Sequence, residues 1–480
     1  MNKKFYITTT LPYVNAKPHI GFALEIIQAD AVARYYRERG FEVIFNTGTD
    51  EHGQKIYEKA LAEGKDTQAY VDEYAAKFDE LKSSLDLSYT NFIRTSDPDH
   101  KSAAQDFWKR CDANGDIYKD RYQVKYCVGC ELPKTDSELV NGCCPVHVNL
   151  ELELRDEENY FFRWSKYQQP LLDLYAANPD FVVPRNRLTE IQKFVEGGLN
   201  DFSISRLKEK MPWGVSVPGD EDHVMYVWFD ALVNYISTLG WPMEDGNFSD
   251  YWPGVQVAGK DNLRQQSAMW QAMLMSAGIK PSKQVFIHGF ITSAGQKMSK
   301  SMGNVIDPFS EVAEYGTDAV RYYLLREIPS HGDGDFSRER MELRYAELAN
   351  QLGNLVSRVG AMSQKYFDGE LNDVEIDWSA QESKLDAAIK DYDFKLYLDL
   401  VWEVVSEANE IVDKKAPFKL VKVDEAAAKD VLSEIADKVR FIARSLAPIL
   451  PQTSAQILER YGKIVSQGEP LFPRRDQPSN

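Results

Sequence analysis

Three cysteines and a histidine follow a spacing that suits a bound metal. Two residues separate Cys127 from Cys130, two separate Cys144 from His147, and thirteen residues lie between the two pairs. Three thiolates and an imidazole complete the tetrahedral shell of a structural zinc ion. The sequence therefore predicts a closed structural zinc site. Cys143 is an alternative ligand to Cys144, and redox-active or plain buried thiols are the other interpretations.

A second stretch combines positive charge with conformational freedom. The segment GQKMSKSMGN at 295–304 places Lys297 and Lys300 three residues apart, between two glycines. Lysines supply point charge, and glycines permit a loop to fold over a ligand. The pattern predicts a mobile basic loop that binds a polyphosphate, with a solvated surface loop as the alternative. It is not a Walker loop, because glutamine follows the first glycine.

These side chains need elements that position them, and the hydrophobic pattern predicts two strand–helix–strand units. In the first, strands at 5–10 and 42–48 flank a helix that starts near residue 18. In the second, strands at 255–259 and 284–290 flank a helix at 262–277. Connections of this kind imply a parallel sheet with right-handed crossovers. The cysteine-bearing stretch between the two units implies an insertion that splits the sheet.

Polar side chains lie near or after the end of each of the four predicted strands. His19 follows the first, Asp50 the second and Asp261 the third, and His288 lies in the fourth. In open parallel sheets, ligands bind beyond the carboxyl ends of the strands, and a helix start attracts phosphate. We therefore expect a nucleotide site at this edge.

The last part of the chain is predicted to be helical throughout. From about residue 346 the apolar positions form one stripe, which consists of Leu348, Leu352, Leu355, Val359 and Met362. Amphipathic segments at 385–413 and 424–461 follow. The pattern predicts a separate helical bundle.

Composition excludes several classes of function. The net charge of −18 argues against non-specific DNA binding, which depends on basic side chains. No apolar run approaches the roughly 18 residues that a membrane span needs, and the first residues lack the apolar core of a secretory signal. We expect a cytoplasmic monomer with no DNA or membrane partner.

Several segments carry a family resemblance. HIGF at 19–22 and KMSKS at 297–301 resemble the two signatures of class I aminoacyl-tRNA synthetases. LPYVNAKPHIG, TGTDEHGQKI, DFSISR, YVWFDALVNY, AGKD and GNLVSR resemble methionyl-tRNA synthetases in order and spacing, over nearly the whole chain. The resemblance implies an α/β fold: a Rossmann-like parallel sheet split by a zinc-binding insertion, followed by an α-helical anticodon-binding bundle.

The same resemblance implies five parts of the chain. Residues 1–115 and 213–290 would be the halves of the catalytic domain, 116–212 the connective insertion with the zinc knuckles, 291–345 the KMSKS and stem-contact region, and 346–480 the anticodon-binding domain.

The resemblance further implies ATP-dependent ligation of L-methionine to methionine tRNA in protein synthesis, with Mg²⁺ accompanying ATP. The methionine carboxylate would attack the α-phosphate of ATP, and the methionyl group would then pass to the 3′ end of the tRNA. No protein nucleophile is needed, since catalysis of this kind rests on positioning and charge stabilisation.

Site residues are implied position by position. The implied ATP-binding and catalytic residues are His19, Gly21, Gly259, Asp261, His288, Lys297 and Lys300. The implied methionine pocket consists of Leu11, Tyr13, Asp50, Trp228, Ala231, Leu232 and Tyr235, with Asp50 holding the ammonium group. The implied anticodon-binding residues are Asn354, Arg358 and Phe418.

Four positions depart from the family pattern. Phe22 stands where a second histidine is common, so we expect an active enzyme whose missing phosphate donor is supplied elsewhere, a lysine being the candidate. Asn262 replaces an apolar residue and Gln266 replaces a frequent histidine, which changes the pocket wall. Phe418 stands where tryptophan is typical; it keeps a face for base stacking, and its alternative role is packing in the bundle core.

Two other functions remain open at this point. A class I synthetase for leucine, isoleucine or valine would carry an editing insertion much larger than the roughly 100 residues available here. A cysteine enzyme would use zinc to select its substrate, which a closed site does not permit. A non-catalytic RNA-binding relative is favoured by Phe22 and Gln266 and opposed by the two loop lysines. Amino-acid-dependent pyrophosphate exchange separates these alternatives.

Overall fold

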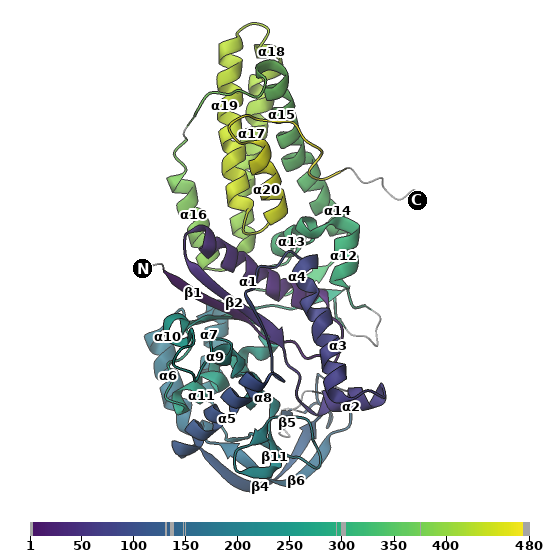
Figure 1. Ribbon diagram of the computed structural model, residues 1–480, viewed down its shortest axis with the longest axis vertical. Helices are drawn as coiled ribbons and strands as arrows, with labels where there is room; N and C mark the ends of the chain where they lie inside the picture. The colour runs from purple at the N-terminus through teal and green to yellow at the C-terminus, as the bar shows by residue number, and fades with distance from the viewer. Residues whose placement is uncertain are drawn as a thin grey trace. The chain divides into compact units, whose positions relative to one another are not determined.

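The computed structural model divides the chain into two compact units. The residues that it describes are 3–129, 132–134, 139–146, 148, 150–293, 295–298, 304–374 and 376–473. The sheet unit comprises Met1–Pro18, Glu42–Glu80 and Tyr89–Ile287. The helical unit comprises His19–Phe41, Leu81–Ser88 and His288–Asn480. Figure 1 traces both along the chain by colour.

A six-stranded sheet lies at the centre of the sheet unit, with strand order β3-β2-β1-β12-β13-β7. The bounds are β1 Lys4–Thr9, β2 Glu42–Thr49, β3 Asn91–Arg94, β7 Val182–Val183, β12 Val255–Gly259 and β13 Gln284–His288. β1 pairs in parallel with both β2 and β12. Every residue of β12 is buried, as is typical of a parallel strand covered on both faces. The prediction of a parallel sheet split by an insertion is confirmed.

The insertion contributes its own antiparallel sheet, in the order β5-β4-β6-β8. The bounds are β4 Ile117–Cys127, β5 Leu132–Lys134, β6 Glu153–Phe162 and β8 Phe202–Ser203. A three-stranded sheet follows, formed by β9 Ser205–Leu207, β10 Ser216–Val217 and β11 Asp220–Met225. The core of the sheet unit is aromatic: the ring of Phe107 lies 5.4 Å from that of Trp270 and 5.8 Å from that of Trp241.

Helices complete the sheet unit. They are α2 Gln54–Ala62, α3 Thr67–Asp79, α5 Pro98–Ala113, α6 Gln168–Ala177, α7 Arg185–Glu196, α8 Val227–Ala231, α9 Asn234–Ser237, α10 Phe248–Tyr251 and α11 Trp270–Ser276, with short 3₁₀ turns η2 Trp164–Tyr167 and η3 Lys260–Asn262.

The helix predicted at 262–277 is not uniform. A π-helical turn, η4 Gln265–Met269, precedes α11. The side chain of Gln271 donates to the carbonyl of Gln266 at 2.7 Å, inside the stretch where the regular bonding pattern is shifted. π-helical turns and side chains that bond into the backbone ladder both interrupt the regular geometry of a helix. The hydrophobic period alone did not reveal this interruption.

The helical unit contains α1 and most elements after residue 288. The bounds are α1 Ile20–Glu38, α4 Leu81–Ser84, β14 Ile291–Ser293, β15 Gln296–Lys297, α12 Pro308–Tyr315, α13 Thr317–Arg326, β16 Gly334–Phe336, α14 Arg338–Glu347, η6 Leu348–Gly353, α15 Asn354–Phe367, α16 Ser379–Lys390, α17 Phe394–Lys415, α18 Pro417–Leu420, α19 Glu425–Leu446 and α20 Pro451–Arg460. Within it, α17 and α19 lie side by side (Figure 1). The predicted helical bundle is confirmed.

The bundle differs from the prediction in its boundaries. The first helical run starts at Arg338 rather than near 346 and passes through the π-helical turn η6. The segment predicted at 385–413 is two helices, because Tyr392 adopts a left-handed backbone angle, with φ at 55°. The segment predicted at 424–461 also breaks, between α19 and α20, where Pro448 and Pro451 cannot continue a helix. No helix among the described residues is both long and apolar enough to cross a bilayer.

Candidate functional site

A small cavity in the sheet unit gathers the predicted methionine-binding residues. It is lined by Thr10, Leu11, Asp50, Trp228, Ala231, Leu232, Asn234, Tyr235, Asn262 and Gln266, and its volume is about 30 Å³. These side chains come from the loops after β1 and β2, from α8 and α9, and from the start of the η3–η4 region. Such a volume admits about one water molecule, so a larger ligand would enter only if the wall shifted.

The loop that carries Asp50 is fixed by its neighbours. The backbone N–H of Asp50 donates to the Pro12 carbonyl at 3.0 Å, and its carbonyl accepts from the N–H of Val14 at 3.2 Å. The next side chain, Glu51, is fully buried and accepts from Arg94 Nε at 2.6 Å and Nη2 at 2.9 Å. These bonds hold the Asp50 backbone on both sides while its carboxylate lines the cavity. Tyr13 is absent from the lining but pairs with Asp50 in a β-bridge.

A chain of buried glutamine amides ends on the Tyr235 hydroxyl. The backbone N–H of Ser282 donates to Gln271 Oε1 at 2.9 Å, which identifies Gln271 Nε2 as the donor toward Gln256 Oε1 at 3.4 Å. Gln256 Nε2 then donates to Gln266 Oε1 at 3.2 Å, and Gln266 Nε2 donates to the Tyr235 hydroxyl at 2.7 Å. Since an amide has one donor end and one acceptor end, a single backbone N–H sets the direction of the whole chain. Gln266 therefore fits the pocket wall as a neutral donor.

His19 caps the start of α1 in the helical unit. Its Nδ1 accepts from the N–H of Gly21 at 3.1 Å, so a neutral ring carries its proton on Nε2. His19 is exposed. A Cβ at Gly21 would lie 3.0 Å from Cε1 and Nδ1 of the ring. A side chain at position 21 would therefore press on the capping imidazole, which would have to shift by a few tenths of an ångström.

The first backbone amides of α1 are already bonded. The Ile20 N–H donates to the Ile306 carbonyl at 3.0 Å, and the N–H groups of Phe22 and Ala23 donate to the His19 carbonyl at 3.0 and 3.1 Å. With the Gly21 amide bonded to the His19 ring, the helix start donates to protein acceptors rather than outward. Phosphate binding at this place would therefore depend on side chains.

The lysine loop meets the same helix start. Ile306, whose carbonyl accepts from Ile20, follows the loop, and Met298 Cε lies 3.9 Å from the Cβ position of Gly21. The backbone of Lys297 belongs to β15 and pairs with Thr292 of β14. Lys300 lies outside the described residues. Met298 of the lysine loop thus lies close to Gly21 at the start of α1.

The remaining predicted ATP ligands lie at strand ends. Gly259 is the last residue of β12, and Asp261 follows it, exposed, in η3. His288 ends β13 and is buried; its Nε2 lies 3.0 Å from Glu25 Oε2 and its Nδ1 lies 2.7 Å from the Gly289 carbonyl. Both ring nitrogens thus have protein partners, which ties His288 to α1.

The predicted anticodon-binding residues lie on the surface of the helical unit. Asn354 is exposed at the start of α15, and Arg358, one turn later, pairs with Asp413 at 2.9 Å. Phe418 in α18 is 40% exposed, so the alternative role as a bundle-core residue is wrong. All three side chains are accessible to a partner.

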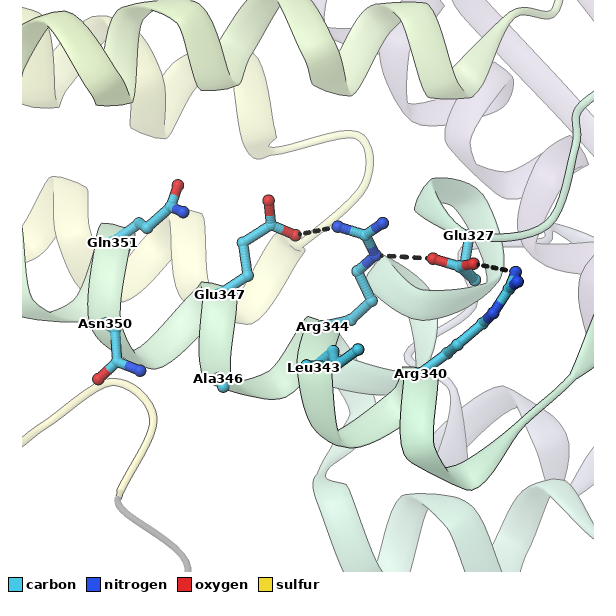
Figure 2. A pocket seen from close by; sticks show the side chains of 8 residues that line it. All are labelled: Glu327, Arg340, Leu343, Arg344, Ala346, Glu347, Asn350 and Gln351. Carbon is cyan, nitrogen blue, oxygen red and sulfur yellow. Dashed lines mark hydrogen bonds and ion pairs between the residues drawn. The ribbon is translucent and has the colours of Figure 1, made fainter.

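A groove lies on the same helical run, before Asn354. Its volume is about 570 Å³. Figure 2 shows its side chains, in which Glu327 joins Arg340 to Arg344 and Arg344 joins Glu347. Two arginines and two glutamates cancel in charge, so the groove offers no excess positive charge for a phosphate. Its ion pairs brace the helical run that leads to Asn354 and Arg358.

Only half of the predicted zinc site falls within the described residues. Cys127, at the end of β4, and Cys144 are both fully buried, whereas Cys143 is half-buried. Cys130 and His147 lie outside the described residues. Within the described part of the chain no group of three metal-ligating side chains is present. The buried Cys144 is better placed than Cys143 for a closed site.

Comparison with known proteins identifies the family. The family described as class I tRNA synthetases (M) matches residues 5–151 and 146–360. The methionine–tRNA ligase of Thermosynechococcus vestitus is 45% identical, covering 98% of this chain and 93% of its own length. The chain belongs to the class I methionyl-tRNA synthetase family. The Synechocystis methionine–tRNA ligase, another member, is 42% identical over 95% of this chain and 89% of its own.

Solved structures of the methionyl-tRNA synthetase family share the fold. The Mycobacterium tuberculosis methionyl-tRNA synthetase in complex with methionyl-adenylate aligns with a TM-score of 0.92 at 37% identity, covering 98% of this chain and all of that chain. The free-state enzyme of the same organism aligns with a TM-score of 0.86 at 34% identity, covering 100% and 99%. An α/β chain with a parallel sheet and a helical C-terminal region is thereby established.

Two residues that line the cavity were not predicted from the sequence. Thr10 and Asn234 line the cavity, and neither was singled out. Asn234 is three residues after Ala231, and that spacing on one helical face is a signal that could have found it. The buried partners of the pocket residues, such as Gln256, carry no comparable signal, because their contacts depend on the folded chain.

Proposed function

We propose that the chain activates methionine with ATP and transfers it to tRNA through the residues assigned below. ATP-dependent methionine–tRNA ligation is the reaction of its family. In the first step a methionine carboxylate oxygen bonds to the α-phosphorus of ATP, and the bond to pyrophosphate breaks. In the second, a hydroxyl of the terminal tRNA ribose bonds to the methionyl carbonyl carbon, and AMP leaves.

The observation that carries this assignment is the cavity of the sheet unit. Asp50 is the acidic residue of a wall otherwise made of aromatic, apolar and neutral polar side chains. We assign Asp50 to the methionine ammonium group and Leu11, Trp228, Ala231, Leu232 and Tyr235 to the thioether chain, with Tyr13 bracing Asp50. A polarizable, aromatic wall suits a thioether.

For ATP, we assign the phosphates to His19 and to Lys297 and Lys300. The exposure of His19 at the start of α1 supports this role. We assign the ribose to Gly259 and Asp261, and His288 to the adenylate surroundings. Mg²⁺ accompanies ATP and neutralises part of the triphosphate charge. Donors held in place stabilise the charge that develops as pyrophosphate leaves.

For tRNA, we assign the anticodon to Asn354, Arg358 and Phe418 in the helical unit. Their exposure supports this role, and stacking of one base on Phe418 would contribute about 1–3 kcal/mol. The groove of Figure 2 is not part of this assignment, because its charges cancel.

We also propose a structural zinc ion held by Cys127, Cys130, Cys144 and His147. The full burial of Cys127 and Cys144 supports it, because a closed structural zinc site is shielded from solvent. Zinc would hold the tip of the insertion in one fold. We further propose the five-part domain division at 1–115, 116–212, 213–290, 291–345 and 346–480, and a monomer that acts in the cytoplasm.

The test is pyrophosphate exchange measured with methionine, leucine, isoleucine, valine and cysteine in turn. We expect exchange with methionine alone, and Asp50→Asn should raise the KM for methionine by roughly thirtyfold or more, since truncating one partner of a buried charge pair costs about 2 kcal/mol or more. Phe22→His should change the rate only modestly if the donor lies elsewhere. Absence of methionine-dependent exchange by the unaltered protein would exclude the assignment and favour a non-catalytic relative.

A further inference from the structure

Three buried side chains of the sheet unit form a hydrogen-bonded cluster beside the cavity. Asp230 and His100 are 0% exposed and His52 is 1% exposed. His52 Nδ1 lies 2.9 Å from Asp230 Oδ2, and His100 Nε2 lies 3.3 Å from Asp230 Oδ1. The other nitrogen of His100 lies 3.0 Å from Ser237 Oγ. Each carboxylate oxygen of Asp230 is therefore within hydrogen-bonding distance of one imidazole ring.

The cluster joins three segments of the chain, and two of them line the cavity. His52 is two residues after Asp50, and Asp230 lies in α8 between Trp228 and Ala231. His100 comes from α5. Asp230 itself is not among the lining residues. It is thus placed to hold the acidic side of the pocket and its apolar side at a fixed separation.

The other bonds of this loop do not duplicate the link. Glu51 is bound to Arg94, and its carbonyl accepts from Trp213 Nε1 at 2.5 Å, so these contacts fix the loop to β3 and to the segment before β10. Among the bonds described, His52 to Asp230 connects the loop to α8.

The charge of Asp230 strengthens the link. Burial by itself raises the pKa of this carboxyl, but His52 and His100 lower it by more, so that the pKa lies below its usual value. The carboxylate is ionised at neutral pH, and hydrogen bonds to an ionised acceptor are about twice as strong as neutral ones.

We propose that Asp230 is a positioning residue for methionine binding. Through its hydrogen bond to His52 it keeps Asp50 and the cavity wall formed by α8 in a fixed relative position, without touching the substrate. This inference rests on the proposed function, since it concerns the same pocket. The proposed reaction is the same with this inference. Loss of the Asp230 carboxylate would displace Asp50, the residue assigned to the methionine ammonium group, and would therefore weaken methionine binding more than ATP binding.

The test compares Asp230→Asn with a matched control, Asp116→Asn. Asp116 is also fully buried in the sheet unit and accepts from Ser276, Asn114 and Lys166, each at 2.7 Å, but none of these residues lines the cavity. In pyrophosphate exchange, Asp230→Asn should raise the KM for methionine by about tenfold to a hundredfold, the usual cost of losing a hydrogen bond to a charged group. The KM for ATP should change by less than about threefold. Asp116→Asn should leave both KM values unchanged.

A second pair keeps the inference testable if Asp230→Asn does not fold. Asparagine at position 52 places a side-chain N–H close to that of His52 Nδ1, whereas alanine does not. We expect His52→Asn to retain most of the methionine affinity and His52→Ala to lose it, with thermal unfolding confirming that both are folded. Equal KM values for methionine in this pair, or equal effects of Asp230→Asn and Asp116→Asn, would overturn the inference. Absence of exchange by the unaltered protein would instead overturn the proposed function.

Discussion

Replacing Arg321 with methionine removes a fully buried cation from the helical unit. Arg321 Nη2 pairs with Asp30 Oδ2 at 2.8 Å, and its guanidinium also donates to the carbonyls of Ile449 at 2.7 Å and of Leu85 and Pro448 at 3.1 Å. It therefore joins α13 to α1 and to the corner between α19 and α20. Breaking a buried pair from one side typically costs about 3–5 kcal/mol. That loss lowers the folded-to-unfolded ratio by roughly two to four powers of ten.

The loss depends on pH in a direction that the structure fixes. In the unaltered protein burial raises the pKa of Asp30, but Arg321, Arg34 and Ser88 bring it below its ordinary value. Asp30 then contributes stability above its unfolded pKa, and this contribution disappears as the pH falls. Without Arg321, the rise in the pKa of Asp30 caused by burial is less compensated, so this pKa increases. Protonation of Asp30 at lower pH then removes the unpaired buried charge. The destabilisation by Arg321→Met should therefore be smaller at pH 5 than at pH 7.

Amide hydrogen exchange followed by mass spectrometry is the suitable assay, because a chain of two units need not unfold in one step. We expect faster exchange in α1, in α13 and at Pro448–Leu450, with the sheet unit unchanged. Asp30→Asn combined with Arg321→Met should recover part of the loss, since it removes the stranded charge. Unchanged exchange in α1 at pH 7, or a deficit that grows as the pH falls, would refute the reasoning.

Three further predictions follow from the assigned sites. Arg358→Ala should raise the KM for tRNA by about tenfold, which is the lower end of the effect expected for losing a hydrogen bond to a charged group. Pyrophosphate exchange should be unchanged. An equal loss in both assays would count against an anticodon role. Gln266→Met should lower the ratio of the pyrophosphate-exchange rate with methionine to that with norleucine by about tenfold, because it removes the donor that orients the Tyr235 hydroxyl. An equal loss of rate with both amino acids would indicate that Gln266 acts through packing alone. Gly21→Ala should reduce the exchange rate by displacing the His19 ring, and an unchanged rate would exclude the capping role.

The sheet and its site could be predicted because they follow from local patterns. β1, β2, β12 and β13 are apolar runs bounded by polar turns, and a parallel sheet brings their carboxyl ends to one edge. Asp50, which follows β2, was therefore expected at that edge from topology, whereas Leu11 was expected only from the family resemblance. The family resemblance then added α8 and α9, whose short amphipathic turns would not have been assigned to a pocket from pattern alone.

The rest depends on contacts that no local pattern encodes. The partners of Asp230 come from positions 52 and 100, and their separation in the chain gives no sign of their 2.9 and 3.3 Å approaches. The π-helical turn at Gln265–Met269 is stabilised by the side chain of Gln271, which a hydrophobic period does not reveal. The breaks at Tyr392 and between α19 and α20 arise from backbone geometry, and only the prolines near the second were visible in the sequence.

Phe22 becomes understandable once the amides of α1 are accounted for. A helix start usually attracts phosphate through its unpaired N–H groups, but here those of Ile20, Gly21, Phe22 and Ala23 all have protein acceptors. The hydrogen-bond donors to a phosphate at this place would thus be side chains, and the candidates are His19 and the loop lysines. A half-buried phenylalanine at position 22 removes one side-chain donor without disturbing this capping arrangement, because only its backbone takes part. Restoring a histidine there would add a donor beside an already complete cap, so the gain in rate should be small, whereas loss of the charge at Lys297 should be severe.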